Sequence, residues 1–203
     1  MTVFYHKGDL PAGIDFGDCV AVDSETMGLS LVRDELCVVQ LSDGKGDAHV
    51  VQLDRKTYNS PNLKALMGNT AVEKLFHFGR FDIAMIGKYL GVEIAPVFCT
   101  KIASKLSRTY TDRHGLKDLV RELVGVDLNK QQQSSDWGAD TLTEAQLAYA
   151  ASDVLYLHAA KAKLAEMLVR HNRMEIAKAC FDFLPTQAKL DLLGYEATDI
   201  FAH

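Results

Sequence analysis

The sequence is short of cysteine and proline and has no long apolar run, and each shortage excludes a class of protein. Its four cysteines form no Cys-x-x-Cys pair, and Cys19 and Cys37 lie in apolar runs, so we expect buried thiols rather than disulfides or zinc ligands. No stretch approaches the roughly 20 apolar residues that span a bilayer. Because residues 1–7 also lack the charged-then-apolar layout of a signal peptide, we expect a cytoplasmic protein with no membrane partner.

Positive charge is scarce as well, since the formal net charge is -5. Affinity for long duplexes takes many phosphate contacts from Lys and Arg, so this balance argues against a general duplex binder. A small positive patch would still hold a short strand, and an acidic metal centre would itself lower the total. The 203 residues, 48% hydrophobic, suffice for one domain with a substantial core. With no linker or repeat, the chain predicts a single domain over residues 1–203.

The order of the expected elements indicates an α/β domain with a mixed sheet. Apolar runs bounded by turn signals predict strands at 20–23, 36–41, 49–53 and 74–78. Helical patterns follow at 62–67, 80–90, 100–106 and 116–123. Thr143 and Gln146 form a capping-box pattern that opens a helix reaching about residue 169. The last stretch, 173–193, is predicted to be helical and broken at Pro185.

Four acidic residues and a tyrosine in three segments could gather around metal ions. Asp23 and Glu25 end the first strand two residues apart, so their side chains point to the same face. Asp82 lies just after a later strand, and Tyr149 and Asp153 are four apart on one helix face. Hard oxygen ligands suit Mg²⁺ or Mn²⁺, and two such ions roughly 4 Å apart can cleave a phosphodiester. The sequence therefore predicts a phosphodiester hydrolase.

Each piece has a plainer explanation when taken alone. The Asp23-x-Glu25 pair could be a solvated turn, Asp82 could cap the helix that starts near Arg80, and Tyr149 could be an ordinary core aromatic. Asp153 sits on the apolar side of its helix, where an acid needs a partner, and a metal is one. Only the three segments together, in this order, favour the metal site.

The three segments resemble the ExoI, ExoII and ExoIII motifs of the DEDD 3′-5′ exonucleases, in the DEDDy form with its tyrosine at Tyr149. Within that superfamily, residues 36–41 resemble the RNase D branch, as do residues 130–137 leading into 142–146. Residues 77–82, 99–106 and 199–203 resemble the compact nanoRNase C type. The resemblance implies an RNase H-like (DnaQ-like exonuclease) fold with a core at about 18–170. It leaves no room for the HRDC domains of RNase D, and segment 171–203 is expected to serve packing or oligomerisation.

The resemblance also implies a role for each candidate catalytic residue. Two divalent ions, Mg²⁺ or Mn²⁺, would be bound by Asp23, Glu25, Asp82 and Asp153. Tyr149 would orient the attacking water. Glu25, with nearby backbone amides, would hold the terminal 3′-hydroxyl of the substrate.

Two candidate substrate-binding residues lie close to these motifs. Leu29 matches the leucine that wedges between the last two bases in the related oligoribonuclease family, although it could be a core residue after the turn at Gly28. His77 precedes Asp82 by five residues, where many DEDD enzymes also place a histidine, although a structural histidine at a strand end is an alternative.

Two polar segments offer further contacts to a short strand. The loop 109–114, with Arg113 and His114, mixes an aromatic ring, hydroxyls and cations as short-strand recognition requires. Cations at helical spacing, Lys101, Lys105 and Arg108, are an alternative phosphate grip. The run 131–137 is expected to line the substrate channel through Gln133, Ser134 and Trp137, although Trp137 could equally be a packing anchor.

The resemblance and the acidic charge together favour a 3′-5′ exoribonuclease that hydrolyses short single-stranded RNA, down to dinucleotides, to nucleoside 5′-monophosphates. RNase D-like trimming of tRNA 3′ ends and DNA-directed exonuclease activity are alternatives. A non-catalytic nucleic-acid binder is disfavoured because all five catalytic positions are present. The apolar residues of segment 173–193 predict a homo-oligomer, and the resemblance implies an octameric ring.

Overall fold

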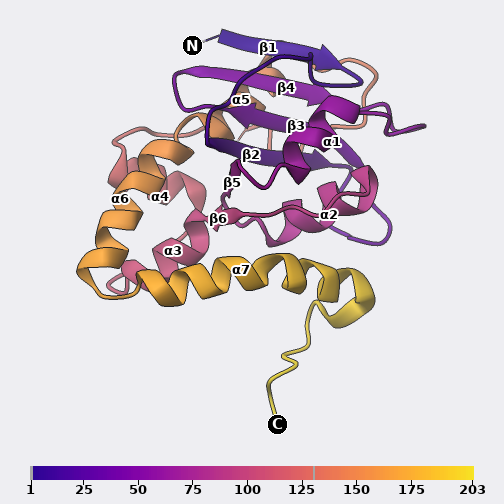
Figure 1. The fold of residues 1–203 in the computed structure, drawn as a ribbon. Coiled ribbons are helices and arrows are strands. Elements are labelled where there is room, and N and C mark those ends of the chain that lie inside the picture. The colour runs from indigo at the N-terminus through magenta and orange to yellow at the C-terminus, as the bar shows by residue number, and fades with distance from the viewer. Residues whose placement is uncertain (1, 130) are drawn as a thin grey trace.

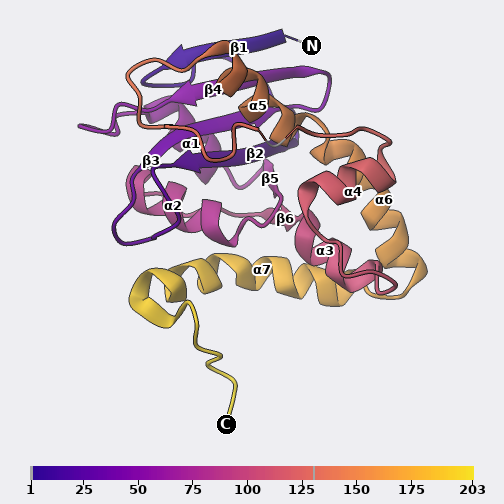
Figure 2. The ribbon, with the colours of Figure 1, turned by 180° about the vertical axis from the view of Figure 1, so that it is seen from behind.

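The computed structural model describes residues 2–129 and 131–203. Met1 and Lys130 lie outside the described residues, and Lys130 is the first residue of one run compared above with RNase D. A six-stranded sheet forms the centre of the molecule, with α1 on one face and α5 on the other (Figures 1 and 2). Helix α7 runs along the β6 side of the sheet (Figure 1).

The strands confirm the predicted mixed sheet. They are β1 (Thr2–Lys7), β2 (Cys19–Thr26), β3 (Leu36–Ser42), β4 (Asp47–Gln52), β5 (Glu73–Phe76) and β6 (Val97–Cys99). In the sheet their order is β1-β4-β3-β2-β5-β6. The pairs β2–β3 and β3–β4 are antiparallel, and the other three pairs are parallel.

Two strands were not predicted, and one predicted strand is shorter than expected. β1 is an edge strand with exposed and half-buried side chains, and β6 has only three residues, so neither carries a long apolar signal. The strand predicted at 74–78 ends at Phe76, because Phe78 has a φ of 64° and cannot continue an extended strand.

The helices are α1 (Pro61–Gly68), α2 (Arg80–Leu90), α3 (Thr100–Ser107), α4 (Leu116–Leu123), α5 (Glu144–Leu155), α6 (Leu157–Arg170) and α7 (Met174–Leu190), followed by a π-helical turn η1 (Asp191–Tyr195). The capping box of Thr143 and Gln146 is confirmed. The predicted long helix that follows it is two helices, α5 and α6, which meet at Tyr156 with φ -105° and ψ 0°.

The predicted break at Pro185 is wrong, because α7 continues through it. Proline lacks the N–H that would bond to the carbonyl four residues earlier, and this normally weakens a helix. Here Phe181, Leu184 and Ala188 are buried on one side of α7, and their packing keeps the helix continuous.

Burial agrees with a sheet covered on both faces. Every residue of β3 is buried, including the thiol of Cys37 as predicted, whereas Cys19 is only half-buried; all four cysteines are free. None of the helices in the described ranges combines the length and apolarity needed to cross a membrane.

Lys74, on β5, is a fully buried cation with a structural role. Its Nζ donates to the backbone carbonyls of Asn69 and Val72, each at 2.7 Å, and of Ala95 at 2.6 Å. The turn at residues 69–72 and the segment at Ala95 therefore both depend on one buried ammonium group for their hydrogen bonds.

Replacing Lys74 should destabilise the fold markedly. Lys74→Met keeps much of the side-chain volume but leaves three carbonyls without their donor, and we expect a loss of roughly 3 kcal/mol in the free energy of unfolding. Urea denaturation followed by circular dichroism measures this loss. Lys163→Met, at an exposed position of α6, is the matched control and should change stability little. Equal effects of the two substitutions would contradict the role assigned to Lys74.

Candidate active site

β2 brings the first two acids to the centre of the sheet. Asp23 lies opposite Gln40 of β3, whose Nε2 donates to Asp23 Oδ2 at 3.2 Å. Glu25 lies opposite Val38, and the register shifts between Glu25 and Thr26. Because residues two apart on a strand share a face, both carboxylates point to the same side of the sheet.

A tight turn between β5 and α2 places the third acid. Phe78 adopts a left-handed conformation, and a Cβ on Gly79 would lie 2.6 Å from the Cβ of Phe76, so only glycine fits there. Asp82 follows in the first turn of α2, where it is almost fully buried. The Ser24 hydroxyl donates to Asp82 Oδ1 at 2.6 Å and thereby ties α2 to β2.

Helix α5 contributes the fourth acid and the tyrosine. Tyr149 and Asp153 are one turn apart, and the Tyr149 hydroxyl interacts with the Asp153 carboxylate. The Trp137 ring lies 6.0 Å from the Tyr149 ring, with only 2% of Trp137 exposed. Trp137 is therefore a packing anchor behind Tyr149, which was the alternative considered above. The prediction that it lines the substrate channel is wrong.

The carboxylates form a tight cluster. One oxygen from each of Asp23, Glu25 and Asp153 lies within 4.8 Å of the others. Burial raises the pKa of Asp23 well above its usual value, and repulsion from Asp82, Asp153 and Glu25 raises it further. The same two causes raise the pKa of Glu25 to about 9, while burial raises that of Asp82 to about 7.

This donor set fits a hard divalent cation. All the candidate ligands are carboxylate oxygens, which Mg²⁺ and Mn²⁺ prefer. Several like charges at such distances in a buried site repel one another, and a cation removes that repulsion. Asp23, Glu25 and Asp153 would hold the ion directly, and Asp82 lines the same cavity from α2.

The cavity in front of the carboxylates has a volume of about 460 Å³. Of the predicted substrate-binding residues, it is lined by Leu29, His77 and Gln133. Leu29 is 82% exposed, so the alternative that it is a core residue is wrong. His77 Nδ1 lies 2.9 Å from the Thr100 hydroxyl, so this histidine is also fixed to α3.

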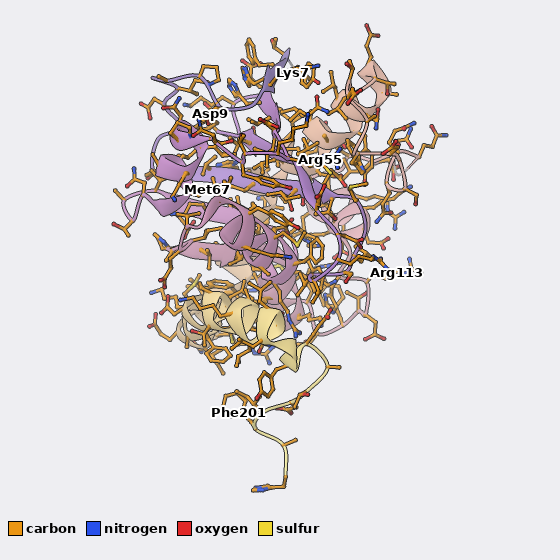
Figure 3. The ribbon with its side chains drawn as sticks, turned by 90° about the vertical axis from the view of Figure 1, so that its right-hand side faces the viewer. Lys7, Asp9, Arg55, Met67, Arg113 and Phe201 are labelled. Atoms are coloured by element: carbon orange, nitrogen blue, oxygen red, sulfur yellow. The ribbon has the colours of Figure 1, made fainter. Side chains whose placement is uncertain are left out.

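Other predicted contacts lie away from the cavity. Arg113 is exposed and points outward from the body of the molecule (Figure 3), and Ser134 is also exposed. His114 Nδ1 lies 2.9 Å from the Ser104 hydroxyl, in a network with Arg108. Arg108 is fully buried and ion-paired with Glu122, so it is not available to grip a phosphate. These described residues do not line the cavity.

Several lining residues were not among the predicted site residues. They are Ser24, Thr26, Phe78, Phe81, Lys101, Gly115, Leu116, Lys117, Leu128, Asn129 and Glu196. Phe78 and Phe81 lie within the 77–82 motif, and Lys101 belongs to the cations at helical spacing noted above, so these three carried a signal. Glu196 carried none, because its nearness to the site depends on the path of the chain after α7.

A protein-family comparison decides the classification of this arrangement. Residues 11–169 match the model of a 3′-5′ exonuclease family. The chain belongs to this family. The match confirms the predicted fold class, an RNase H-like (DnaQ-like exonuclease) fold with a mixed sheet flanked by helices in a single domain.

Individual members of the 3′-5′ exonuclease family show close similarity. Ribonuclease D of Acidiphilium cryptum is 37% identical over 156 residues, which cover 77% of this chain and 39% of that protein. The chain thus matches well under half the length of this curated relative. The structure of Brucella melitensis NrnC with bound Mg²⁺ is 52% identical with a TM-score of 0.96, and both chains are covered completely. NrnC bound to pGG is 53% identical with a TM-score of 0.97, covering 100% of this chain and 99% of that one.

The raised carboxyl pKa values predict how stability depends on pH in this exonuclease site. A carboxyl whose pKa is higher in the folded than in the unfolded state stabilises the fold at low pH, and this contribution is lost as pH rises through the folded pKa. Unfolded carboxyls titrate at about pH 4, whereas the folded pKa is about 7 for Asp82 and about 9 for Glu25, so the melting temperature in EDTA should fall as pH rises from about 5 to about 9. Mg²⁺ should raise the melting temperature more at the upper end of this range.

Differential scanning fluorimetry across this pH range, with and without Mg²⁺, tests the expectation. Glu25→Gln removes one of the titrating groups and should flatten the metal-free profile. A wild-type profile in EDTA that is flat, or that rises with pH, would contradict the assigned pKa directions.

Proposed function

We propose that this chain is a metal-dependent 3′-5′ exoribonuclease that hydrolyses short RNA, preferentially dinucleotides, to nucleoside 5′-monophosphates. One observation carries the proposal: four carboxylates and a tyrosine, supplied by β2, α2 and α5, line a single cavity of about 460 Å³. This volume is in the range of small-ligand sites, so it suits a strand end better than a long duplex.

In the proposed reaction, each residue of the cavity has a separate role. Two divalent ions, held by the four carboxylates, would activate a water and stabilise the leaving oxygen of the phosphodiester. Tyr149, one helical turn from Asp153, orients the attacking water through its hydroxyl. Glu25, with nearby backbone amides, holds the terminal 3′-hydroxyl. Ser24 and Gln40 fix the carboxylates of Asp82 and Asp23 through hydrogen bonds.

Similarity to NrnC supports the dinucleotide as substrate, because that relative has a structure with pGG bound. The surface around the site agrees, since Lys101 and Lys117 are the cations that line the cavity within the described ranges. Two cations can neutralise few phosphates. Trimming of tRNA ends, by analogy with ribonuclease D, and cleavage of DNA remain the alternative activities.

We further propose a homo-oligomer, with the octameric ring implied by the resemblance as its form. Exposed apolar side chains of α7 and of the segment after it support this proposal, namely Ile176, Phe183, Leu193 and Phe201. Phe183 and Phe201 also contact each other, with ring centroids 6.1 Å apart.

A time course with 5′-labelled RNAs of two to ten nucleotides tests the proposed activity. In Mg²⁺ or Mn²⁺ the wild-type protein should consume dinucleotide fastest, and EDTA should stop the reaction. Asp23→Asn should lower the rate roughly 10³-fold or more, because it removes a ligand charge from the centre. Tyr149→Phe should lower it roughly 10²-fold or more. Accumulation of dinucleotide would rule out the proposed specificity, and cleavage by Asp23→Asn at the wild-type rate would refute the metal assignment.

Leu29 offers a separate test of how the strand end is held. Because this side chain is 82% exposed, Leu29→Ala should leave the melting temperature nearly unchanged. The loss of an apolar contact with the last bases should lower kcat/KM on dinucleotides roughly tenfold. Val32→Ala, at a position that is 81% exposed and does not line the cavity, is the matched control. Equal activity of the two variants would remove Leu29 from substrate binding.

A further inference from the structure

The chain returns to the active-site cavity after its last long helix. α7 passes directly into η1, where Gly194 has a φ of 95°, a left-handed conformation that suits glycine and reverses the chain. Glu196 follows this reversal and lines the same cavity as the four catalytic carboxylates. The remaining tail, with Phe201 near its end, leaves the body of the molecule beyond η1 (Figures 1 and 3).

An ion pair between Arg80 and Asp191, here called the clasp, fixes the path of the chain back to the cavity. Arg80, at the start of α2, pairs with Asp191 through two hydrogen bonds, from Nε and from Nη2, the latter at 2.6 Å. Arg80 Nη2 also donates to the backbone carbonyl of Glu196 at 2.7 Å, and Gln187 Nε2 donates to Asp191 Oδ1 at 2.9 Å. Since only 4% of Asp191 is exposed, the clasp is a packed feature rather than a loose surface contact.

The clasp joins the C-terminal segment to a catalytic element. Arg80 lies two residues before Asp82 in the first turn of α2. The position of Glu196 is therefore set relative to a residue of the catalytic cluster. Because the clasp uses the backbone carbonyl of Glu196, its carboxylate is not needed for this anchoring.

A carboxylate at this place affects which strands fit. Every further linkage of an RNA strand adds one negative charge, and an acidic side chain on the cavity wall repels it. The wall near Glu196 also contains Phe78, which is half exposed and lines both this cavity and the apolar groove along α7. An extended strand that crosses this wall would meet the charge of Glu196 and the half-exposed ring of Phe78, whose centroid lies 4.0 Å from Lys101 Nζ.

We infer that the segment Asp191–Glu196 forms a length-limiting wall of the active site, in which Glu196 disfavours strands carrying phosphates beyond those of a dinucleotide. Arg80 and Asp191 are the positioning residues that hold this wall. The inference rests on the proposed exoribonuclease function and adds a specificity-determining residue to it.

Kinetics with RNAs of two, three and five nucleotides test the role of Glu196. The ratio of kcat/KM for the pentanucleotide to that for the dinucleotide should rise in Glu196→Gln and rise further in Glu196→Lys. The expected change is roughly two- to tenfold, the range for one charge acting over about 5 to 10 Å through a largely aqueous medium. Because exposed charges are screened, the change should shrink in about 1 M salt. Glu175→Gln, which removes an exposed carboxylate of α7, should leave the ratio unchanged.

The clasp is tested by Asp191→Asn, with Gln187→Ala as a milder variant. If the clasp acts by positioning Glu196, each should shift the length ratio in the same direction as Glu196→Gln. Combining Asp191→Asn with Glu196→Gln should then add little to the larger single effect. Circular dichroism melting identifies a variant that fails to fold, and Gln187→Ala then provides the measurement.

The outcomes separate this inference from the proposed function. A wild-type protein that cleaves no RNA of any length would refute both. A dinucleotide-preferring wild type whose length ratio is unchanged in Glu196→Lys would overturn the inference and leave the function intact. Glu196 variants that alter all lengths equally, or independently of salt, would also overturn it, because that result assigns Glu196 to a part of the site that every substrate shares.

Discussion

Repulsion among buried carboxylates is the constraint on which the site depends. Asp23, Glu25 and Asp153 hold oxygens within 4.8 Å of one another, and Asp82 adds a fourth acid to the same cavity. Without a cation, burial and this repulsion raise the pKa values of Asp23 and Glu25, so placing several ionised carboxylates here costs free energy. The fold must therefore hold the acids together against their mutual repulsion, and this is a requirement on the scaffold around them.

The scaffold meets this requirement with rigid elements rather than loops. β2 is a central strand that pairs on both sides, the α2 turn permits only glycine at Gly79, and α5 is fixed by a capping box and by packing on Trp137. Hydrogen bonds from Ser24 and Gln40 to two of the acids complete the arrangement. Such preorganisation lets the ligands bind a cation without first being rearranged.

The parts of the site that follow from local periodicity were predictable from the sequence. Asp23 and Glu25 share a face because strands repeat every two residues, and Tyr149 and Asp153 do so because helices repeat every 3.6 residues. The predictions that failed concern features that depend on contacts between residues far apart in the sequence. β1 pairs with β4 across more than forty residues, and α7 continues through Pro185 because of tertiary packing. Arg113 and His114 do not line the cavity, and the buried Arg108 bonds to the Arg113 carbonyl and to Ser104, the partner of His114. From the sequence, Trp137 could either line the substrate channel or act as a packing anchor. Only its burial against α5 decided between these roles.

The candidate catalytic residues and the residues that we infer to limit substrate length lie in different parts of the chain. The match to the 3′-5′ exonuclease family ends at residue 169, and all five candidate catalytic residues lie before that point. Asp191 and Glu196 lie after it, in the part of the chain that the NrnC structures also cover. The catalytic centre is built from strand and helix periodicity, whereas the C-terminal segment that reaches the cavity wall is joined to α2 through the bonds of Arg80 to Asp191 and to the Glu196 carbonyl. In the role that we infer for Glu196, substrate length depends on tertiary contacts that no local motif encodes, which explains why the acids were found from the sequence and Glu196 was not.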